Sequence, residues 1–134
     1  MKKLLFLFLL SLVTACQSNP ATEQAVSVAG SSYKNVSVTE LASILKTKDF
    51  VLINVHIPFA GNIVDTDLSI PYDEVEQNVF QLPTDKNAKI VLYCRSGRMS
   101  EIAAEKLTSL GYTDIWNLKG GMLEWEQAGY VLEK

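Results

Sequence analysis

The stretch that decides the fold reads Lys89-Ile-Val-Leu-Tyr-Cys94-Arg-Ser-Gly-Arg-Met-Ser100. After one lysine it is apolar and partly β-branched, as in a strand buried on both faces of a parallel sheet. A short turn with Gly97 follows, and apolar residues at helical spacing begin after Ser100. A strand, a tight turn and a helix in this order place Cys94 at the carboxyl end of a strand, where sites form in α/β sheets.

The alternation of strands and helices continues on both sides of this stretch. Apolar runs predict further strands at 50–55, 68–70 and 114–116, and 3.6-residue spacing predicts helices at 39–45, 72–82, 100–110 and 122–128. Thr39 is the expected N-cap of the first helix. Asp73 and Glu76 resemble a capping box at the start of the second helix, and Pro83 is expected to end that helix. Short connections between alternating elements predict an α/β fold with a mostly parallel sheet covered by helices on both faces.

The turn after Cys94 has the composition of an anion-binding loop. Backbone N–H groups around Gly97 can converge on one point, and the helix that follows contributes the partial positive charge of its N-terminus. Arg95 and Arg98 add two full charges. Each of these features favours a thiolate over a thiol, so we expect Cys94 to ionise readily and to act as a nucleophile.

The N-terminus resembles a targeting sequence. Lys2 and Lys3 precede a largely apolar run of ten residues, about half the length that a membrane-spanning helix needs, which indicates a secretory signal peptide over residues 1–15. The following Val13-Thr14-Ala15-Cys16 resembles the lipobox of bacterial lipoproteins, and that resemblance implies lipid on Cys16. Ordinary cleavage after Ala15 is the alternative. Gln17 then implies the periplasmic face of the outer membrane, with residues 16–35 as a flexible tether and 36–134 as the folded domain.

Composition and charge narrow the function classes. The chain has 134 residues, enough for one ordinary domain, and a formal net charge of −3. Removal of the signal peptide would leave 10 basic residues against 15 acidic ones, a net charge of −5 that gives no general attraction to nucleic acid. Once Cys16 is lipidated, Cys94 is the only thiol, and one histidine, His56, with one thiol falls short of a metal site.

Several motifs together resemble the rhodanese, or thiosulfate sulfurtransferase, domain. Residues 94–100 look like its active-site loop, and Leu118-Lys-Gly-Gly-Met-Leu-Glu-Trp125 looks like its C-terminal signature. The resemblance runs from about Val36 to Leu132 and also takes in Ile70-Pro-Tyr-Asp73 and the turn at Gly111. It is similar to the small, single-domain exported members, and it implies a rhodanese-like fold with a five-stranded, mostly parallel sheet.

The resemblance also implies an activity. In that family the cysteine thiolate takes the outer sulfur of thiosulfate or a similar donor, holds it as a persulfide and passes it to cyanide or a thiol. Cys94 would be the catalytic residue, and no cofactor is needed. The donor would be bound by the residues that follow Cys94, namely Arg95, Ser96, Gly97, Arg98, Met99 and Ser100. We expect small-molecule substrates and favour a monomer, although the sequence leaves the oligomeric state open.

One part of the family pattern is missing. The family often shows Asp-x-Arg after the second strand, where this chain has Asn54-Val55-His56, and the loop from Ile57 to Asp67 also departs from the common wording. A charged pair has been lost or replaced at this place, which leaves the substrate open. We interpret His56 as a structural residue rather than a general base, because an ionised thiol needs no base.

Three other functions fit parts of the pattern. A persulfide carrier or partner-binding module that does not turn over would keep the same loop. A rhodanese-fold phosphatase or arsenate reductase would also present a cysteine on an anion-binding loop, but its Cys-x5-Arg pattern requires arginine where this chain has Ser100. A redox enzyme fits least, because no second thiol lies beside Cys94 to resolve a disulfide.

Overall fold

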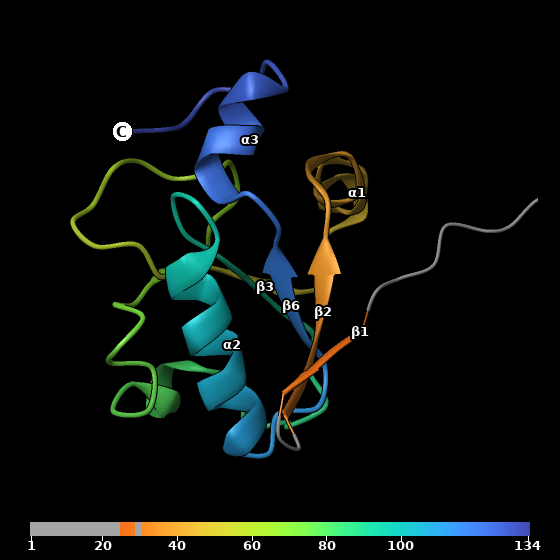
Figure 1. Cartoon of the computed structure of the whole chain (residues 1–134), viewed down its shortest axis with the longest axis vertical. Coiled ribbons are helices and arrows are strands. Elements are labelled where there is room, and N and C mark those ends of the chain that lie inside the picture. The colour runs from red at the N-terminus through yellow and green to blue at the C-terminus, as the bar shows by residue number, and fades with distance from the viewer. Residues whose placement is uncertain (1–24, 29–30) are drawn as a thin grey trace, which may run out of the picture.

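One sheet organises the part of the chain that the computed structural model describes, residues 25–28 and 31–134. Its strands lie in the order β1-β2-β6-β5-β3-β4, and every neighbouring pair is parallel except β1 and β2 at one edge (Figure 1). The predicted α/β fold with a five-stranded parallel sheet is confirmed, and an antiparallel sixth strand is added to it. The strands are β1 (Ala25–Val28), β2 (Ser31–Val36), β3 (Val51–Asn54), β4 (Leu68–Ser69), β5 (Ile90–Tyr93) and β6 (Ile115–Leu118).

The folded part of the chain begins before the predicted boundary at residue 36. The predicted tether was to run to Asn35, but 31–36 form β2, which pairs with β6 inside the sheet, and 25–28 form β1 beside it. These short strands mix serine, lysine and asparagine with apolar residues, so their sequences show no sustained hydrophobic run of the kind that predicted the other strands. The predicted signal peptide and Cys16 lie outside the described residues.

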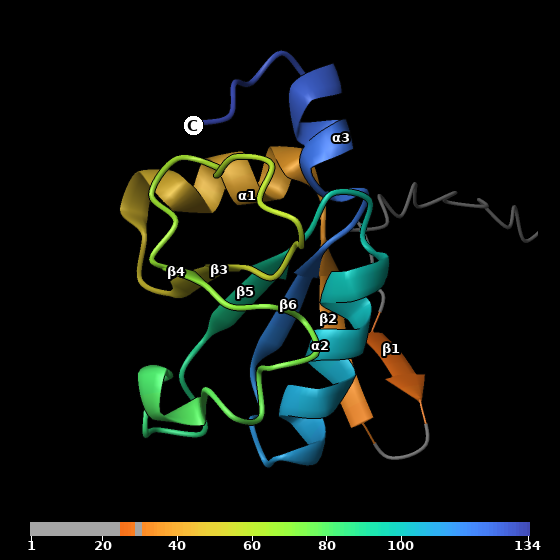
Figure 2. The same ribbon diagram turned by 90° about the vertical axis from the view of Figure 1, so that its left-hand side faces the viewer.

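Three α-helices cover the two faces of the sheet (Figures 1 and 2). They are α1 (Val38–Ile44), α2 (Arg98–Ser109) and α3 (Gly121–Gln127), with short 3-10 turns η1 (Leu45–Thr47) and η2 (Val79–Gln81). The N-cap of α1 is Ser37 and not the predicted Thr39. Ser37 Oγ accepts the N–H of Glu40 at 3.3 Å, and the Glu40 carboxylate accepts the N–H of Ser37 at 2.7 Å, which together make a capping box.

The helix predicted for 72–82 is wrong. This segment consists of turns that end in η2. Val75 and Leu82 are buried as the spacing required, but Val79, which the spacing placed on the same face, is 36% exposed. The Asn78 side chain also donates to the carbonyl of Glu74 at 2.8 Å, a local bond of the kind that competes with a continuous helix.

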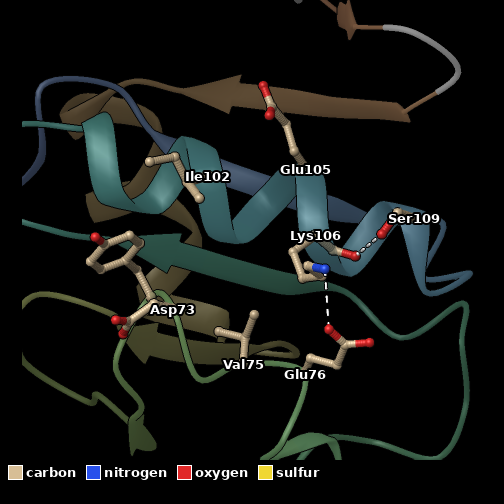
Figure 3. A pocket seen from close by; sticks show the side chains of 8 residues that line it. Asp73, Val75, Glu76, Ile102, Glu105, Lys106 and Ser109 are labelled. Atoms are coloured by element: carbon tan, nitrogen blue, oxygen red, sulfur yellow. Dashed lines mark hydrogen bonds and ion pairs between the residues drawn. The ribbon is translucent and has the colours of Figure 1, made fainter.

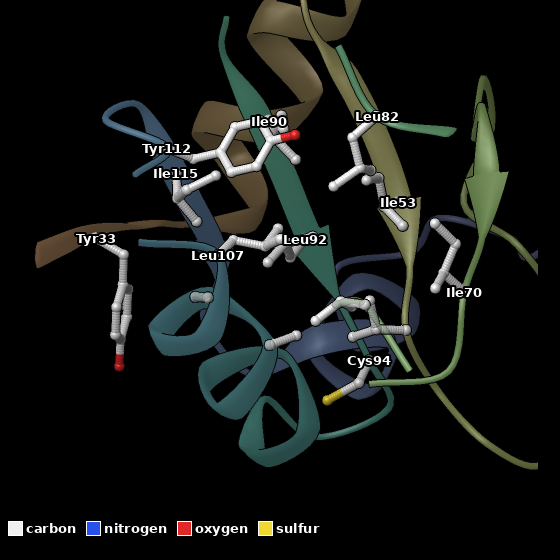
Figure 4. Packing of buried hydrophobic residues seen from close by; sticks show 14 residues of the cluster. Tyr33, Ile53, Ile70, Leu82, Ile90, Leu92, Cys94, Leu107, Tyr112 and Ile115 are labelled. Carbon is white, nitrogen blue, oxygen red and sulfur yellow. The ribbon is translucent and has the colours of Figure 1, made fainter. Parts of the chain in front are cut away.

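The strand β5 is the centre of the core. All four of its residues are buried, and they alternate between the two faces. Ile90 and Leu92 pack against α2, whereas Val91 and Tyr93 pack in the cluster that includes residues of α1 and α3. The same alternation directs the next residue, Cys94, to the α2 face (Figure 4). Among the described residues, no helix has the length and apolar character to cross a membrane.

Candidate active site

The candidate site is built around the sulfur of Cys94. Cys94 directly follows β5, and its sulfur is directed toward α2 (Figure 4). The residue is only 1% exposed and belongs to the apolar cluster under α2. Two polar groups nevertheless reach the sulfur: the N–H of Gly97 donates to Sγ at 3.0 Å, and the hydroxyl of Ser100 approaches it at 3.4 Å. A cysteine that served only to fill the core would not need these donors.

Gly97 makes the tight turn between Cys94 and α2. Its φ of +106° lies in the left-handed region, where a side chain is strained, and it is the N-cap of α2. The N–H groups of Arg98, Met99 and Ser100 in the first helical turn find no acceptor among the described residues. Unpaired N–H groups and the positive end of α2 therefore lie next to the thiol, where they favour negative charge.

The start of α3 holds the other side of the loop. The N–H of Met122 donates to the carbonyl of Cys94 at 2.9 Å, and the N–H of Leu123 donates to the carbonyl of Arg95 at 3.0 Å. Gly121 lies so close that an added Cβ would overlap the Cys94 carbonyl oxygen and lie 2.8 Å from the carbonyl carbon of Arg95. The C-terminal signature thus acts through its backbone, by satisfying its own helix N-terminus with carbonyls of the cysteine loop.

The predicted substrate-binding residues fall into three groups by burial. Gly97 and Ser100 are buried and contact the sulfur, as described above. Met99 is half-buried and packs against the core cluster. Arg95, Ser96 and Arg98 are exposed, and neither arginine forms an ion pair with any described carboxylate. Two unpaired guanidinium groups beside the loop give it the positive charge that the sequence predicted.

An open hollow adjoins this loop at Arg95. It has a volume of about 640 Å³ and is lined by Ala60, Arg95, Glu126, Tyr130, Val131, Leu132 and Lys134. A second hollow of about 410 Å³ lies between α2 and the segment 72–76, where Asp73, Glu76 and Glu105 are its acidic residues (Figure 3). Cys94 lines neither hollow, but Arg95 of the cysteine loop lines the first, whereas no residue of that loop lines the second, whose three carboxylates are accompanied by one lysine, Lys106. The hollow at Arg95 is the one that belongs to the site.

A buried polar network lies behind the loop, and the sequence did not predict it. The side chain of Asn54, at the end of β3, donates to the carbonyl of Gly61 and to the side chain of Asn62. Asn62 also accepts from the hydroxyl of Tyr93 at 3.3 Å. Burial raises the pKa of Tyr93 above its ordinary value, so its hydroxyl stays protonated near neutral pH. A polar residue at the end of the otherwise apolar run 50–55 was the available signal.

His56 lies near the loop without entering the chemistry of the sulfur. The pKa of His56 is lowered from its ordinary value, first because burial penalises the imidazolium and second because the positive Arg95 is near. Its Nδ1 is buried and has no hydrogen-bond partner among the described residues. The structure thus holds a neutral imidazole here.

The lowered pKa of His56 predicts a pH dependence of stability. Near and below the ordinary histidine pKa of about 6.5, the unfolded chain binds a proton more readily than the folded one. The folded state therefore loses stability as the pH is lowered through this range. We expect His56→Gln to lose less of its melting temperature than the natural protein between about pH 7.5 and about pH 5.5. Carboxylates titrate equally in both proteins, so identical pH profiles would contradict this account of His56.

The side chains that could ligate a metal lie apart from one another in the described part of the chain. No three residues of His, Cys, Asp and Glu gather there closely enough to hold a metal ion. The site that the structure does present is a single thiol beside the N-terminus of a helix, with two exposed arginines in the segment that follows it. These features define an α/β domain that is suited to attack by sulfur on an anionic substrate.

Comparison with known proteins identifies the family. The model of the rhodanese-like domain matches residues 23–128, and the chain belongs to this family. It is 31% identical over 85 residues to a sulfurtransferase of Allochromatium vinosum, covering 62% of this chain and 78% of that protein. It is 34% identical over 70 residues to thiosulfate sulfurtransferase PspE of Escherichia coli K12, covering 51% and 67%. The crystal structure of a rhodanese-related protein of Thermoplasma volcanium aligns with a TM-score of 0.63 and 27% identity, covering 73% of this chain and 95% of that one.

Proposed function

We propose that this protein is a sulfurtransferase that carries sulfur on Cys94. The observation that carries the proposal is the 3.0 Å contact from the Gly97 N–H to Sγ, at the N-terminus of α2. A donor and a helix N-terminus that stabilise a thiolate also stabilise the negative terminal sulfur of a persulfide. The sulfurtransferases among the chain's relatives support the same reaction.

The proposed reaction has two steps. The Cys94 thiolate attacks the outer sulfur of thiosulfate, a new S–S bond forms, and the electron pair of the donor's S–S bond leaves with sulfite. The persulfide then gives its outer sulfur to cyanide or a thiolate, and the Cys94 thiolate is restored. Division of one transfer into two steps is covalent nucleophilic catalysis. The charge balances at each step, so no cofactor is needed.

Access of the donor is provided by the exposed part of the loop. Because Cys94 is 1% exposed, the donor must reach the sulfur past the loop residues Arg95, Ser96 and Arg98, which are exposed. The arginines attract the negatively charged donor through its sulfonate group and bring its outer sulfur toward Sγ. Their charges remain effective in a negatively charged protein, because distant surface acids are screened within about 10 Å at 0.1 M salt.

An activity comparison tests the function and its rivals. The full chain should form thiocyanate from thiosulfate and cyanide over many turnovers, and it should release no nitrophenol from p-nitrophenyl phosphate. Phosphate release that depends on Cys94, without sulfur transfer, would favour a phosphatase. Ser100 occupies the place of the phosphatase arginine and is fully buried with its hydroxyl near Sγ, which argues against that outcome. Uptake of a single sulfur without turnover would favour a carrier.

Arg98 offers a test of donor binding. Arg98→Ala should lower kcat/KM for thiosulfate. The expected loss of transition-state stabilisation is about 1.5–3 kcal/mol, the range for a hydrogen bond to a charged group. Arg98 is exposed at the first position of α2, so its loss should leave the melting temperature nearly unchanged. Steady-state kinetics with varied thiosulfate measures the effect, and unchanged kinetics would remove Arg98 from donor binding.

We also propose that the protein is exported and anchored to the periplasmic face of the outer membrane. The supporting observation is the sequence from Lys2 to Gln17, which resembles a lipoprotein signal. Lipid chains on Cys16 would hold the domain on the bilayer, since two or more chains give stable anchoring. In a detergent phase-separation experiment, the natural protein should then enter the detergent phase, whereas the Cys16→Ser variant should stay in the aqueous phase. Equal partition of the two would refute the anchor.

A further inference from the structure

Asn54 is a buried polar residue beside the cysteine strand, and its hydrogen bonds reach the loop that lines the hollow at Arg95. It is 1% exposed and uncharged, at the end of β3 beside β5. Its Nδ2 donates to the Gly61 carbonyl at 3.0 Å and to Asn62 Oδ1 at 2.9 Å, and its Oδ1 accepts the N–H of His56 at 2.9 Å. Both amide hydrogens and the carbonyl of this side chain are used.

These bonds fix the loop that follows β3. One side chain joins the beginning of the loop, at His56, to its middle, at Gly61 and Asn62. An aspartate has no hydrogens for the two oxygen atoms that Asn54 reaches, so an ionised carboxylate would not make this set of bonds. The neutral amide thus replaces the charged pair that the family pattern led us to expect here.

The same loop holds the C-terminal segment. The N–H of Asn62 donates to the carbonyl of Glu133, and the N–H of Glu133 donates to the carbonyl of Asn62, both at 2.7 Å. Gly61 permits this approach: its φ is +113°, and an added Cβ would lie 3.0 Å from the Glu133 carbonyl oxygen. Figure 2 shows the end of the chain after α3 running beside this loop.

The loop and the C-terminal segment form two walls of the hollow at Arg95. Ala60, directly before Gly61, lines it from the loop, and residues 130–132 with Lys134 line it from the other segment. Asn54 bonds the first wall directly and holds the second through Asn62. We propose that Asn54 is a positioning residue that sets the shape of this hollow and so sets how an anionic sulfur donor binds beside Arg95.

This inference rests on the proposed function. One of the measurements that test it, the alkylation of Cys94, does not depend on sulfur transfer. The variants are Asn54→Ala and, because the first removes a buried group, the half-buried Asn62→Ala. The matched control is Asn117→Ala, since Asn117 is also buried in the sheet but bonds Asn35 on β2 at 2.9 Å. All are made in the full chain and compared by melting temperature, thiosulfate kinetics and alkylation of Cys94.

The kinetic expectation is a change in KM rather than in kcat. Asn54→Ala and Asn62→Ala should raise KM for thiosulfate about tenfold, as for one or two lost hydrogen bonds, and should change kcat by less than about twofold. Asn117→Ala should lower the melting temperature without raising KM. If all three variants lose stability alike and keep the natural KM, Asn54 is a residue of the fold only and the inference is overturned.

Alkylation separates this inference from the proposed function. The ratio of the Cys94 reaction rates with anionic iodoacetate and neutral iodoacetamide measures how well the hollow admits an anion, and peptide mapping separates Cys94 from Cys16. The ratio should fall in Asn54→Ala and Asn62→Ala but not in Asn117→Ala. If the natural protein transfers no sulfur but the ratio still falls, the function is wrong and the role of Asn54 stands. An unchanged ratio overturns the role of Asn54.

Discussion

Replacement of Cys94 by serine should reduce sulfur transfer to the background rate, a loss of at least about 10³-fold, as when a covalent nucleophile is removed. A serine hydroxyl fits the same place and can accept the Gly97 N–H, but it neither ionises near neutral pH nor forms a persulfide. The folded structure should persist, so the melting temperature should change by only a few degrees, as expected for about 1 kcal/mol in a small domain. Thiocyanate formation by the purified full chain measures the loss.

The matched control for this variant is Cys16→Ser. It removes the other cysteine of the chain and leaves the loop unchanged, so it should keep the natural rate of sulfur transfer. If Cys94→Ser retained turnover, or if Cys16→Ser abolished it, Cys94 would not be the sulfur carrier.

Substitution of Gly121 should damage both stability and activity. Its φ is +58°, and an added Cβ would overlap the Cys94 carbonyl oxygen, which is backbone and cannot move aside cheaply. Gly121→Ala should therefore lower the free energy of unfolding by about 2–4 kcal/mol, from backbone strain together with steric overlap. The cysteine loop would also be pushed away from α3, so sulfur transfer should fall steeply. Urea unfolding and the thiocyanate assay measure the two effects.

Gly129 provides the control at the other end of α3. Its φ is +92°, but an added Cβ there meets no atom within 4 Å. Gly129→Ala should cost only the strain of a left-handed residue, about 1–2 kcal/mol, and should leave sulfur transfer intact. If Gly121→Ala behaved like Gly129→Ala in both assays, close packing of α3 on the cysteine loop would not matter for the site.

Elements with a strong pattern were predictable from the sequence. The strand β5 is an apolar run and β3 is one apart from Asn54, because nearly all of their residues are buried, and the helix α2 has a buried apolar stripe and a glycine beyond its end. The segment 72–82 was misjudged because its apolar residues satisfy helical spacing while local asparagine bonds and turns take its backbone elsewhere. Strands β1 and β2 were missed, since each is short and mixes polar with apolar residues, which carries little signal.

The site was predictable only where its parts are adjacent in the chain. Cys94, Gly97 and Ser100 lie within seven residues, and their contacts follow from one tight turn before a helix. The support from α3 is made through backbone carbonyls, which leave no trace in side-chain chemistry. The bonds of Asn54 depend on how a loop folds back on its own strand. Contacts of this kind require the three-dimensional arrangement.

The most direct test of the account is the mass of the protein after thiosulfate. Full chain treated with thiosulfate and freed of it should gain about 32 Da, one sulfur atom, on the peptide that contains Cys94, and cyanide should remove it with formation of thiocyanate, as a covalent intermediate requires. Cys94→Ser should gain nothing. A natural protein that turns over thiosulfate without this added mass, or that carries the sulfur on another residue, would contradict transfer through Cys94.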